Sequence, residues 1–222
     1  MEKYERFLPD EPQRLNETEL DRLLKFCVDL GSSDITIQSN EPIIAEVHGR
    51  LYKITRRKMT HSEAGALLNG MYGPNGTTQL LSGKDLDHYY EFRPSRTERI
   101  RFRLNATACL VDGHNGMQMT LRTIPADPPL LKDMDLLPEV EEAITPEQGV
   151  VYITGATGSG KSTLLAAIIR SIAEDPESHR KILTYESPIE FVYDTVEKHT
   201  AVISQSEIPL HIPSFAAGVR NA

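Results

Sequence analysis

What this 222-residue sequence lacks excludes several classes of protein. No apolar run approaches the ~18 residues of a membrane span, and the charged start MEKYERFLPDEPQRLNE has no apolar signal-peptide core. Net positive charge is also missing: the formal net charge is −8 and the pI is about 5.4. Because a nucleic-acid footprint is basic, we expect a soluble protein with no direct nucleic-acid binding.

Metal and disulfide patterns are missing as well. The two cysteines, Cys27 and Cys109, have no ligand-like spacing and lie among apolar residues, and the seven histidines form no i, i+4 pair. We predict two buried free thiols, as is typical of a reducing compartment.

The first half of the sequence predicts an α+β domain at 15–125, preceded by a loose arm at 1–14. Two capping boxes, Asn16 with Glu19 and Thr60 with Glu63, predict helices that end near Gly31 and Tyr72. A short helix is expected within 75–83, and tight turns are expected at Gly49–Arg50 and within DGHNG (112–116). Strands are expected at 34–38, 43–49, 51–54, 87–92, 99–111 and 116–124.

The second half has a different composition. The proline-rich stretch at 126–145 predicts a linker with one short helix after Pro138, followed by an α/β domain at 146–222. GVVYITG at 149–155 is typical of a buried parallel strand, and KSTLLAAIIRSIAED after the glycine-rich loop is typical of a helix. KILTYE at 181–186 predicts a second strand, AVISQSE at 201–207 is a candidate third, and FAAGVRNA begins a helix.

The motif GATGSGKS, from Gly155 to Ser162, has the spacing G-x-x-x-x-G-K-S. Its glycines allow successive backbone N–H groups to converge on a phosphate chain at a helix N-terminus. Lys161 supplies an ammonium for the β- and γ-phosphates, Ser162 a hydroxyl for Mg²⁺, and Thr163 a candidate contact to the α-phosphate. The sequence therefore predicts a site for ATP and Mg²⁺, and its nucleotide-binding residues are Gly155, Ala156, Thr157, Gly158, Ser159, Gly160, Lys161, Ser162 and Thr163.

A second informative stretch is ILTYESPIEF at 182–191, in which a buried strand ends at Glu186. The carboxyl ends of strands in an open α/β sheet face the ligand crevice. Glu186 is therefore predicted to hold the metal's water shell, or to orient and deprotonate the attacking water. A cap or a surface salt bridge is the alternative, and for Glu190 both interpretations stay open.

Arginines are concentrated between residues 93 and 103, and either phosphate contact or a solvated β-hairpin explains them. The cluster consists of Arg93, Arg96, Arg99, Arg101 and Arg103.

Taken together, ITGATGSGKSTLLAAII, ILTYESPIEF and RFRLNA with LRTIP resemble the PilT superfamily of secretion ATPases, and within it the ATPases of Dot/Icm type IVB systems. GSSDITIQSNEPIIAEVHGRL is similar to the family's N-terminal opening, so the resemblance covers residues 15–222. It implies a PAS-like N-terminal domain, a RecA-like P-loop domain and a homo-hexamer with ATP sites between subunits. It also implies a motor that powers transport of protein or protein–DNA substrates, cytoplasmic and peripheral to the inner membrane through secretion-complex proteins.

The resemblance also assigns catalytic roles. Lys161 and Ser162 match the Walker A lysine and serine, and Glu186 matches the glutamate of an acidic box near the metal. Arg103 and Arg122 match N-terminal-domain arginines that act on the γ-phosphate, with Arg101 nearby.

Two departures from the family pattern matter. Ser187 replaces the aspartate of the usual E-D-P box, and no apolar strand ending in an acid is expected after Glu186. Since the family's Walker B acid and His box would lie beyond residue 222, we expect a truncated ATPase domain that binds Mg-nucleotide but is inactive alone.

Three functions remain open from the residues alone. They are an ATP-hydrolysing motor, a nucleotide-gated scaffold without turnover, and a P-loop small-molecule kinase. A GTPase is disfavoured because no N-K-x-D motif is present.

Overall fold

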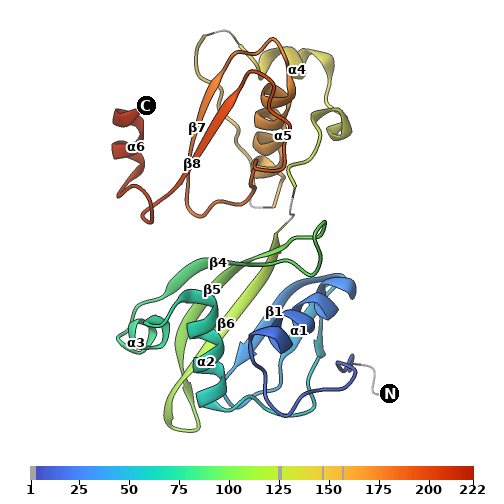
Figure 1. Cartoon of the computed structure of the whole chain (residues 1–222), viewed down its shortest axis with the longest axis vertical. Helices are drawn as coiled ribbons and strands as arrows, with labels where there is room; N and C mark the ends of the chain where they lie inside the picture. Colours follow the sequence, from blue (N-terminus) through green and yellow to red (C-terminus); the bar gives the residue numbers. More distant parts are fainter. Residues whose placement is uncertain (1–3, 125–126, 147, 157) are drawn as a thin grey trace. The chain divides into compact units, whose positions relative to one another are not determined.

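The computed structural model describes residues 4–124, 127–146, 148–156 and 158–222. The chain divides into two compact units, Met1–Ile124 (unit 1) and Pro125–Ala222 (unit 2), each drawn in Figure 1. Within the described ranges, no helix is both long and apolar enough to cross a bilayer.

Unit 1 is an antiparallel sheet with helices on one face (Figure 1). The strand order is β3-β2-β1-β6-β5-β4. The strands are β1 (Ser32–Gln38), β2 (Ile44–Val47), β3 (Arg50–Lys53), β4 (Leu86–Phe92), β5 (Ile100–Val111) and β6 (His114–Ile124). The helices are α1 (Glu17–Asp29), α2 (His61–Tyr72) and α3 (Gly76–Leu81). The strands and helices predicted for this half of the sequence are confirmed, with small shifts at their ends.

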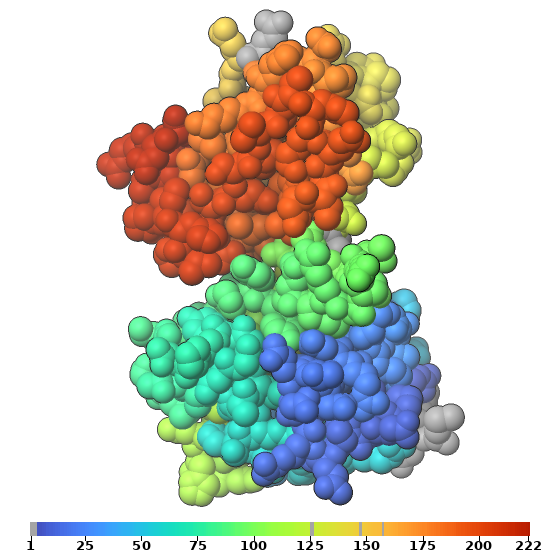
Figure 2. Space-filling model, in the orientation of Figure 1, coloured from blue at the N-terminus to red at the C-terminus, as the bar shows by residue number. Residues whose placement is uncertain are grey.

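The two capping boxes begin their helices as predicted. The Asn16 side chain accepts a hydrogen bond from the Glu19 N–H at 2.9 Å, and the Thr60 hydroxyl accepts one from the Glu63 N–H at 3.2 Å. The apolar residues of α1 form one buried stripe against the sheet, as 3.6-residue periodicity requires. In the space-filling view, the blue residues of α1 and the cyan residues of α2 form one continuous surface (Figure 2).

Two tight hairpins connect the strands. His48 and Gly49 have φ of 50° and 72°, and Asp112 and Gly113 have φ of 48° and 79°, as type I′ turns require. The first turn therefore lies one residue earlier than predicted, because Arg50 is already the first residue of β3.

Both cysteines are free thiols, as predicted. Cys27 is fully buried, and burial raises its pKa to about 12. Cys109 is only partly buried, so the predicted burial of both thiols is wrong for this one. Cys109 lies near the turn of the long β5–β6 hairpin, where the residues on both faces of β5 are at least partly exposed.

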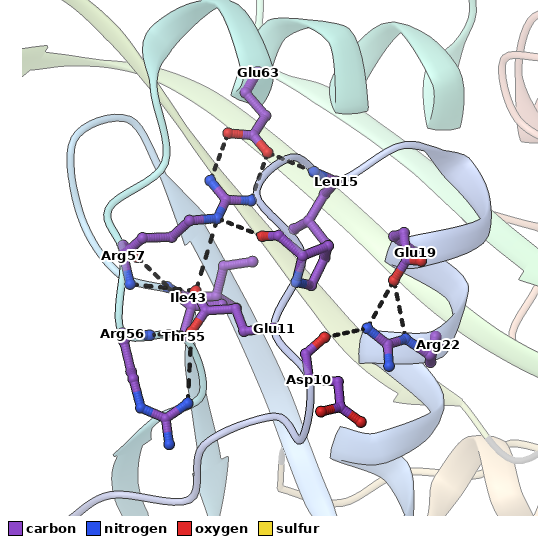
Figure 3. Close-up of polar contacts among 11 residues, drawn as sticks. Asp10, Glu11, Leu15, Glu19, Arg22, Ile43, Thr55, Arg56, Arg57 and Glu63 are labelled. Atoms are coloured by element: carbon purple, nitrogen blue, oxygen red, sulfur yellow. Dashed lines mark hydrogen bonds and ion pairs between the residues drawn. The ribbon is translucent and has the colours of Figure 1, made fainter.

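The expected loose arm at 1–14 is fastened to the sheet over its described residues (Figure 3). Leu8 is 2% exposed, and its N–H donates to the Ile54 carbonyl at 2.9 Å. The Glu11 carboxylate accepts from the backbone N–H groups of Arg56 at 2.7 Å and Arg57 at 3.2 Å. Sequence reasoning missed this contact because the arm's few apolar residues have no periodicity, yet the β3 edge provides backbone partners for them.

Glu63 fastens the end of the arm to α2 (Figure 3). Its carboxylate accepts two hydrogen bonds from the Arg57 guanidinium, both at 2.7 Å, and one from the Leu15 N–H at 2.6 Å. Burial alone would raise the pKa of Glu63, but these hydrogen bonds outweigh it and lower the pKa below its ordinary value of 4.5. Because the folded-state pKa is lowered, this stabilisation is present above pH 4.5 and is lost as the pH falls through the folded-state pKa.

Replacing Glu63 with glutamine is expected to lower the free energy of unfolding of unit 1 by about 2–3 kcal/mol at neutral pH. The amide loses the charge that faces Arg57 and presents a donor to another donor. Native-state hydrogen exchange of the slowest unit 1 amides measures the loss, with Glu41→Gln, at an exposed glutamate, as the control. The difference from the parent should shrink below pH 4.5, and a pH-independent difference would contradict the ion-pair interpretation.

Unit 2 places a helix beside two parallel strands (Figure 1). Its elements are η1 (Leu131–Met134), α4 (Pro138–Ala143), α5 (Lys161–Glu174), β7 (Lys181–Glu186), β8 (Val202–Glu207) and α6 (Phe215–Asn221). The predicted helices and the strands at 181–186 and near 201–207 are confirmed. Residues of the expected linker pack within this unit, since Thr195 donates to the Asp127 carboxylate at 2.8 Å and η1 lies against α5.

The strand predicted at 149–155 is not formed. Val150 and Tyr152 are 74% and 84% exposed, and among the described residues β7 pairs only with β8. Apolar and β-branched composition favours a strand, but a strand exists only where a neighbour completes its hydrogen-bond ladder. A strand that ends in an acid does follow Glu186, since β8 ends at Glu207, but its second half is polar, so it is not the apolar strand that the sequence analysis considered.

Candidate functional site

The glycine-rich loop turns tightly before α5. Gly158 and Gly160 have φ of 79° and 86°, a region that favours glycine, and the Ser159 N–H donates to the Ala156 carbonyl at 3.2 Å. A Cβ added to Gly155 would lie 2.7 Å from the Ser159 hydroxyl oxygen, so a side chain there would require that hydroxyl to move. Thr157, also predicted to bind nucleotide, lies outside the described residues. The described part of the loop therefore has the backbone form that a phosphate cradle needs.

The N-terminus of α5 is open to an anion. Its N-cap is Gly160, no side chain caps it, and its first turn contains no acidic residue. In contrast, α1 and α2 have capping side chains from Asn16 and Thr60 and acidic residues in their first turns. The first N–H groups of α5 and its dipole therefore favour a phosphate at this end.

The Lys161 ammonium lies over the loop. Its Nζ donates to the carbonyl oxygens of Gly155 at 3.1 Å and Ala156 at 2.8 Å. These bonds hold the ammonium against the start of the glycine-rich loop.

A cavity of about 420 Å³ brings the predicted metal-side residues together. Ser162 from α5 and Glu186 from the end of β7 both line it, with Glu190 from the following segment. Within the described ranges, no three His, Cys, Asp or Glu side chains gather as a metal cluster. A hydroxyl and a carboxylate with room for phosphate and water oxygens fit Mg²⁺, which usually keeps several waters and binds few protein ligands.

Glu186 is held by neutral groups. Its Oε1 accepts a hydrogen bond from the Thr184 hydroxyl at 2.7 Å and one from the Gln205 amide at 3.1 Å. No ion pair to Glu186 is found among the described residues, so the surface salt bridge considered from the sequence is not supported. A half-buried carboxylate at a strand end, lining the same cavity as Ser162, is suited to contact a metal ion or a water molecule.

Sequence reasoning missed two residues of β8 that support this site. The Gln205 side chain contacts Glu186, and the Glu207 carboxylate, 5% exposed, accepts from the Ile189 N–H at 3.1 Å. The available signal was the two-residue period of the candidate strand at 201–207, which places Gln205 and Glu207 on the same face.

Arg103 and Arg122 lie side by side in unit 1. They are cross-strand partners in β5 and β6. Arg103 binds Asp87 at 2.6 and 3.1 Å, and Arg122 binds Asp34 at 2.9 Å. Two facing positive charges repel, and the flanking carboxylates offset that repulsion.

Arg101, which precedes Arg103 by two residues in β5, has different partners from Arg103 and Arg122. It lies 3.1 Å from the Glu91 carboxylate and 5.0 Å from the centre of the Tyr89 ring. Arg101 and Arg103 are therefore ion-paired within unit 1. Because Arg101 is 2% exposed, the solvated hairpin considered from the sequence does not describe this residue, and phosphate contact stays a proposal for Arg103 and Arg122.

Comparisons with known proteins extend these observations. The family model for type II/IV secretion system proteins matches residues 95–222. The ATPase DotB of Legionella pneumophila is 61% identical, with a TM-score of 0.82 over 98% of this chain and 59% of that chain. The pilus retraction motor PilT, solved with bound ADP, is 26% identical, with a TM-score of 0.77 over 94% of this chain and 56% of that one.

A twitching motility protein of Neisseria gonorrhoeae is 31% identical over 191 residues, which are 86% of this chain and 47% of the relative. The chain spans about half the length of the curated relatives it matches.

Proposed function

Because the chain belongs to the type II/IV secretion system protein family, as its resemblance to the PilT superfamily predicts, we propose that it is part of an ATP-hydrolysing motor subunit. The observation that carries the proposal is the placement of a glycine-rich loop before an uncapped helix N-terminus, with Ser162 and Glu186 lining one cavity beside it. The names of the relatives support it, since one is an ATPase and another is a motor solved with ADP.

We propose that ATP and Mg²⁺ bind along Gly155–Thr163. The loop N–H groups and Lys161 hold the β- and γ-phosphates, and the Ser162 hydroxyl is a ligand for Mg²⁺. When bound, the metal neutralises charge on the phosphates. Glu186 orients the attacking water and accepts its proton, or holds the metal's water shell.

The finer architecture is also a proposal. We infer a PAS-like domain at 15–125, a linker at 126–145 and a RecA-like domain at 146–222, assembled into a homo-hexamer with ATP sites between subunits. The antiparallel sheet of unit 1 and the parallel strands of unit 2 support two domains, and the linker of this proposal packs in part within unit 2. The motor would act at the cytoplasmic side of the inner membrane, bound to secretion-complex proteins. It would move protein or protein–DNA substrates without binding nucleic acid directly itself.

In such a ring, Arg103 and Arg122 reach the γ-phosphate of a neighbouring subunit. The planar fork of guanidinium donors suits a phosphate, and arginines in this role contribute about 10³-fold or more to rate in other phosphoryl-transfer systems. Each would first exchange its carboxylate partner, Asp87 or Asp34, for phosphate oxygens.

Mixed rings test this role. Lys161→Ala subunits and Arg103→Ala subunits should each be inactive alone and should recover part of the ATPase activity when mixed, because some interfaces then combine an intact loop with an intact arginine. Native mass spectrometry verifies the mixing. Verified mixed rings without recovery at any ratio would contradict action across the subunit boundary.

Steady-state phosphate release from Mg-ATP by the full-length protein tests the proposed function itself. A motor releases phosphate without an added acceptor. Tight binding with no release would instead indicate a nucleotide-gated scaffold, and release of ADP only with a small-molecule acceptor would indicate a kinase.

A further inference from the structure

The Gln205 side chain connects three parts of the candidate site. It lies on β8 directly opposite Thr184 of β7 in the parallel ladder. Its Nε2 donates to Glu186 Oε1 at 3.1 Å and to the Phe191 carbonyl at 2.8 Å, and its Oε1 accepts from the Tyr193 N–H at 3.2 Å. An amide offers two donors and an acceptor in one plane, and here both kinds of group are used.

The segment after β7 follows the polar face of β8. Its alternate residues Ile189, Phe191 and Tyr193 are 7%, 6% and 4% exposed. Glu207 holds the first through its N–H, and Gln205 holds the other two through their backbone groups. The cavity-lining residue Glu190 lies between two of these fixed points.

We propose that Gln205 is a positioning residue for Glu186: it fixes the rotamer of that carboxylate and ties it to the 189–193 segment. The proposal rests on the proposed function. Thr184 and Gln205 both donate to Oε1, and within the described residues no hydrogen bond to Oε2 is found. The second oxygen is therefore the one that faces metal or water, and its direction depends on two donors from adjacent strands.

The polar contacts around Glu186 are partly shielded from water, since Tyr193 is buried and Glu186 is half-buried. Desolvation, and then the nearby charge of Glu186, raise the pKa of the Tyr193 phenol above its ordinary range. Charged and polar groups in such a place lose more when a partner is removed than exposed groups do. Loss of the Gln205 amide should therefore release both the carboxylate and the segment.

The first test is the kinetics of Gln205→Leu in the full-length protein. Because misplacing a catalytic group by about 1 Å costs about 10²-fold, kcat for ATP hydrolysis should fall by about 10- to 100-fold while KM for Mg-ATP changes by less than about threefold. Ser204→Ala, on the exposed opposite face of β8, is the matched control and should match the parent. In a Glu186→Gln background, Gln205→Leu should lower single-turnover rates by less than about twofold, because its effect passes through Glu186.

A second readout does not depend on turnover. The Tyr193 amide should exchange its hydrogen at least about tenfold faster in Gln205→Leu, while the Ile189 amide, held by Glu207, stays protected. Parental kcat with parental Tyr193 protection would overturn the positioning role even if the ATPase assignment stands. A full kinetic loss that persists in the Glu186→Gln background would also overturn it. A parent protein without turnover would remove the proposed function, and the Tyr193 amide would still report whether Gln205 fixes the segment.

Discussion

Replacing Lys161 with alanine is expected to lower steady-state phosphate release from Mg-ATP by about 100-fold or more. The loop backbone and the α5 N-terminus would still cradle the phosphates, but the ammonium at the β/γ position is lost. Positioning and electrostatic stabilisation supply nearly all of phosphoryl-transfer catalysis, so this one charge carries a large share. Its present partners, the carbonyls of Gly155 and Ala156, place it within the loop.

The control for this change is Lys181→Ala, which removes an exposed lysine at the start of β7. It should leave phosphate release unchanged, because it lies at the opposite end of β7 from Glu186. A Lys161→Ala protein that keeps half of the parental rate would contradict the assignment of the loop.

The second large effect is expected for Glu186→Gln, which should keep Mg-ATP binding and lose hydrolysis by about 100-fold or more. The amide preserves the size of the side chain and an acceptor for Thr184, but it is no base and carries no charge for the metal's water shell. Equilibrium binding of a fluorescent ATP analogue and single-turnover hydrolysis separate the two properties.

The outcomes for Glu186→Gln distinguish its two candidate roles. Lost binding in a folded protein would assign Glu186 mainly to the metal shell. Parental binding and parental hydrolysis together would leave Glu186 with a structural role only. Ser206→Ala, one residue before Glu207 on β8, serves as a control for local disturbance of the strand pair.

Much of the fold could be predicted where interactions between residues close in the sequence determine the structure. Asn16 and Thr60 cap helices through short-range hydrogen bonds, and the alternation of β1 and β6 predicts which side chains are buried. The same holds for the phosphate loop, whose glycines and following helix lie within one contiguous stretch.

The predictions failed where contacts between residues distant in the sequence determine the structure. The 149–155 segment has the composition of a buried strand, but no described neighbour completes its ladder. The N-terminal arm is fixed by Arg57 and Glu63, tens of residues away, so neither its order nor its contacts follow from its own composition. The support of Glu186 by Gln205 depends on the parallel register of β7 and β8, which no local pattern specifies.

Metal-directed cleavage tests most directly where the nucleotide binds. In the full-length protein, Fe²⁺ replaces Mg²⁺ with ADP, and ascorbate and peroxide then cut the backbone near the bound metal; mass spectrometry identifies the cuts. If Mg-nucleotide binds as proposed, cuts that require ADP should cluster at residues 158–163 and 186–190, and Lys161→Ala should weaken both clusters. Cuts centred elsewhere, or cuts at these residues that do not depend on ADP, would show that the nucleotide does not bind between the α5 N-terminus and Glu186.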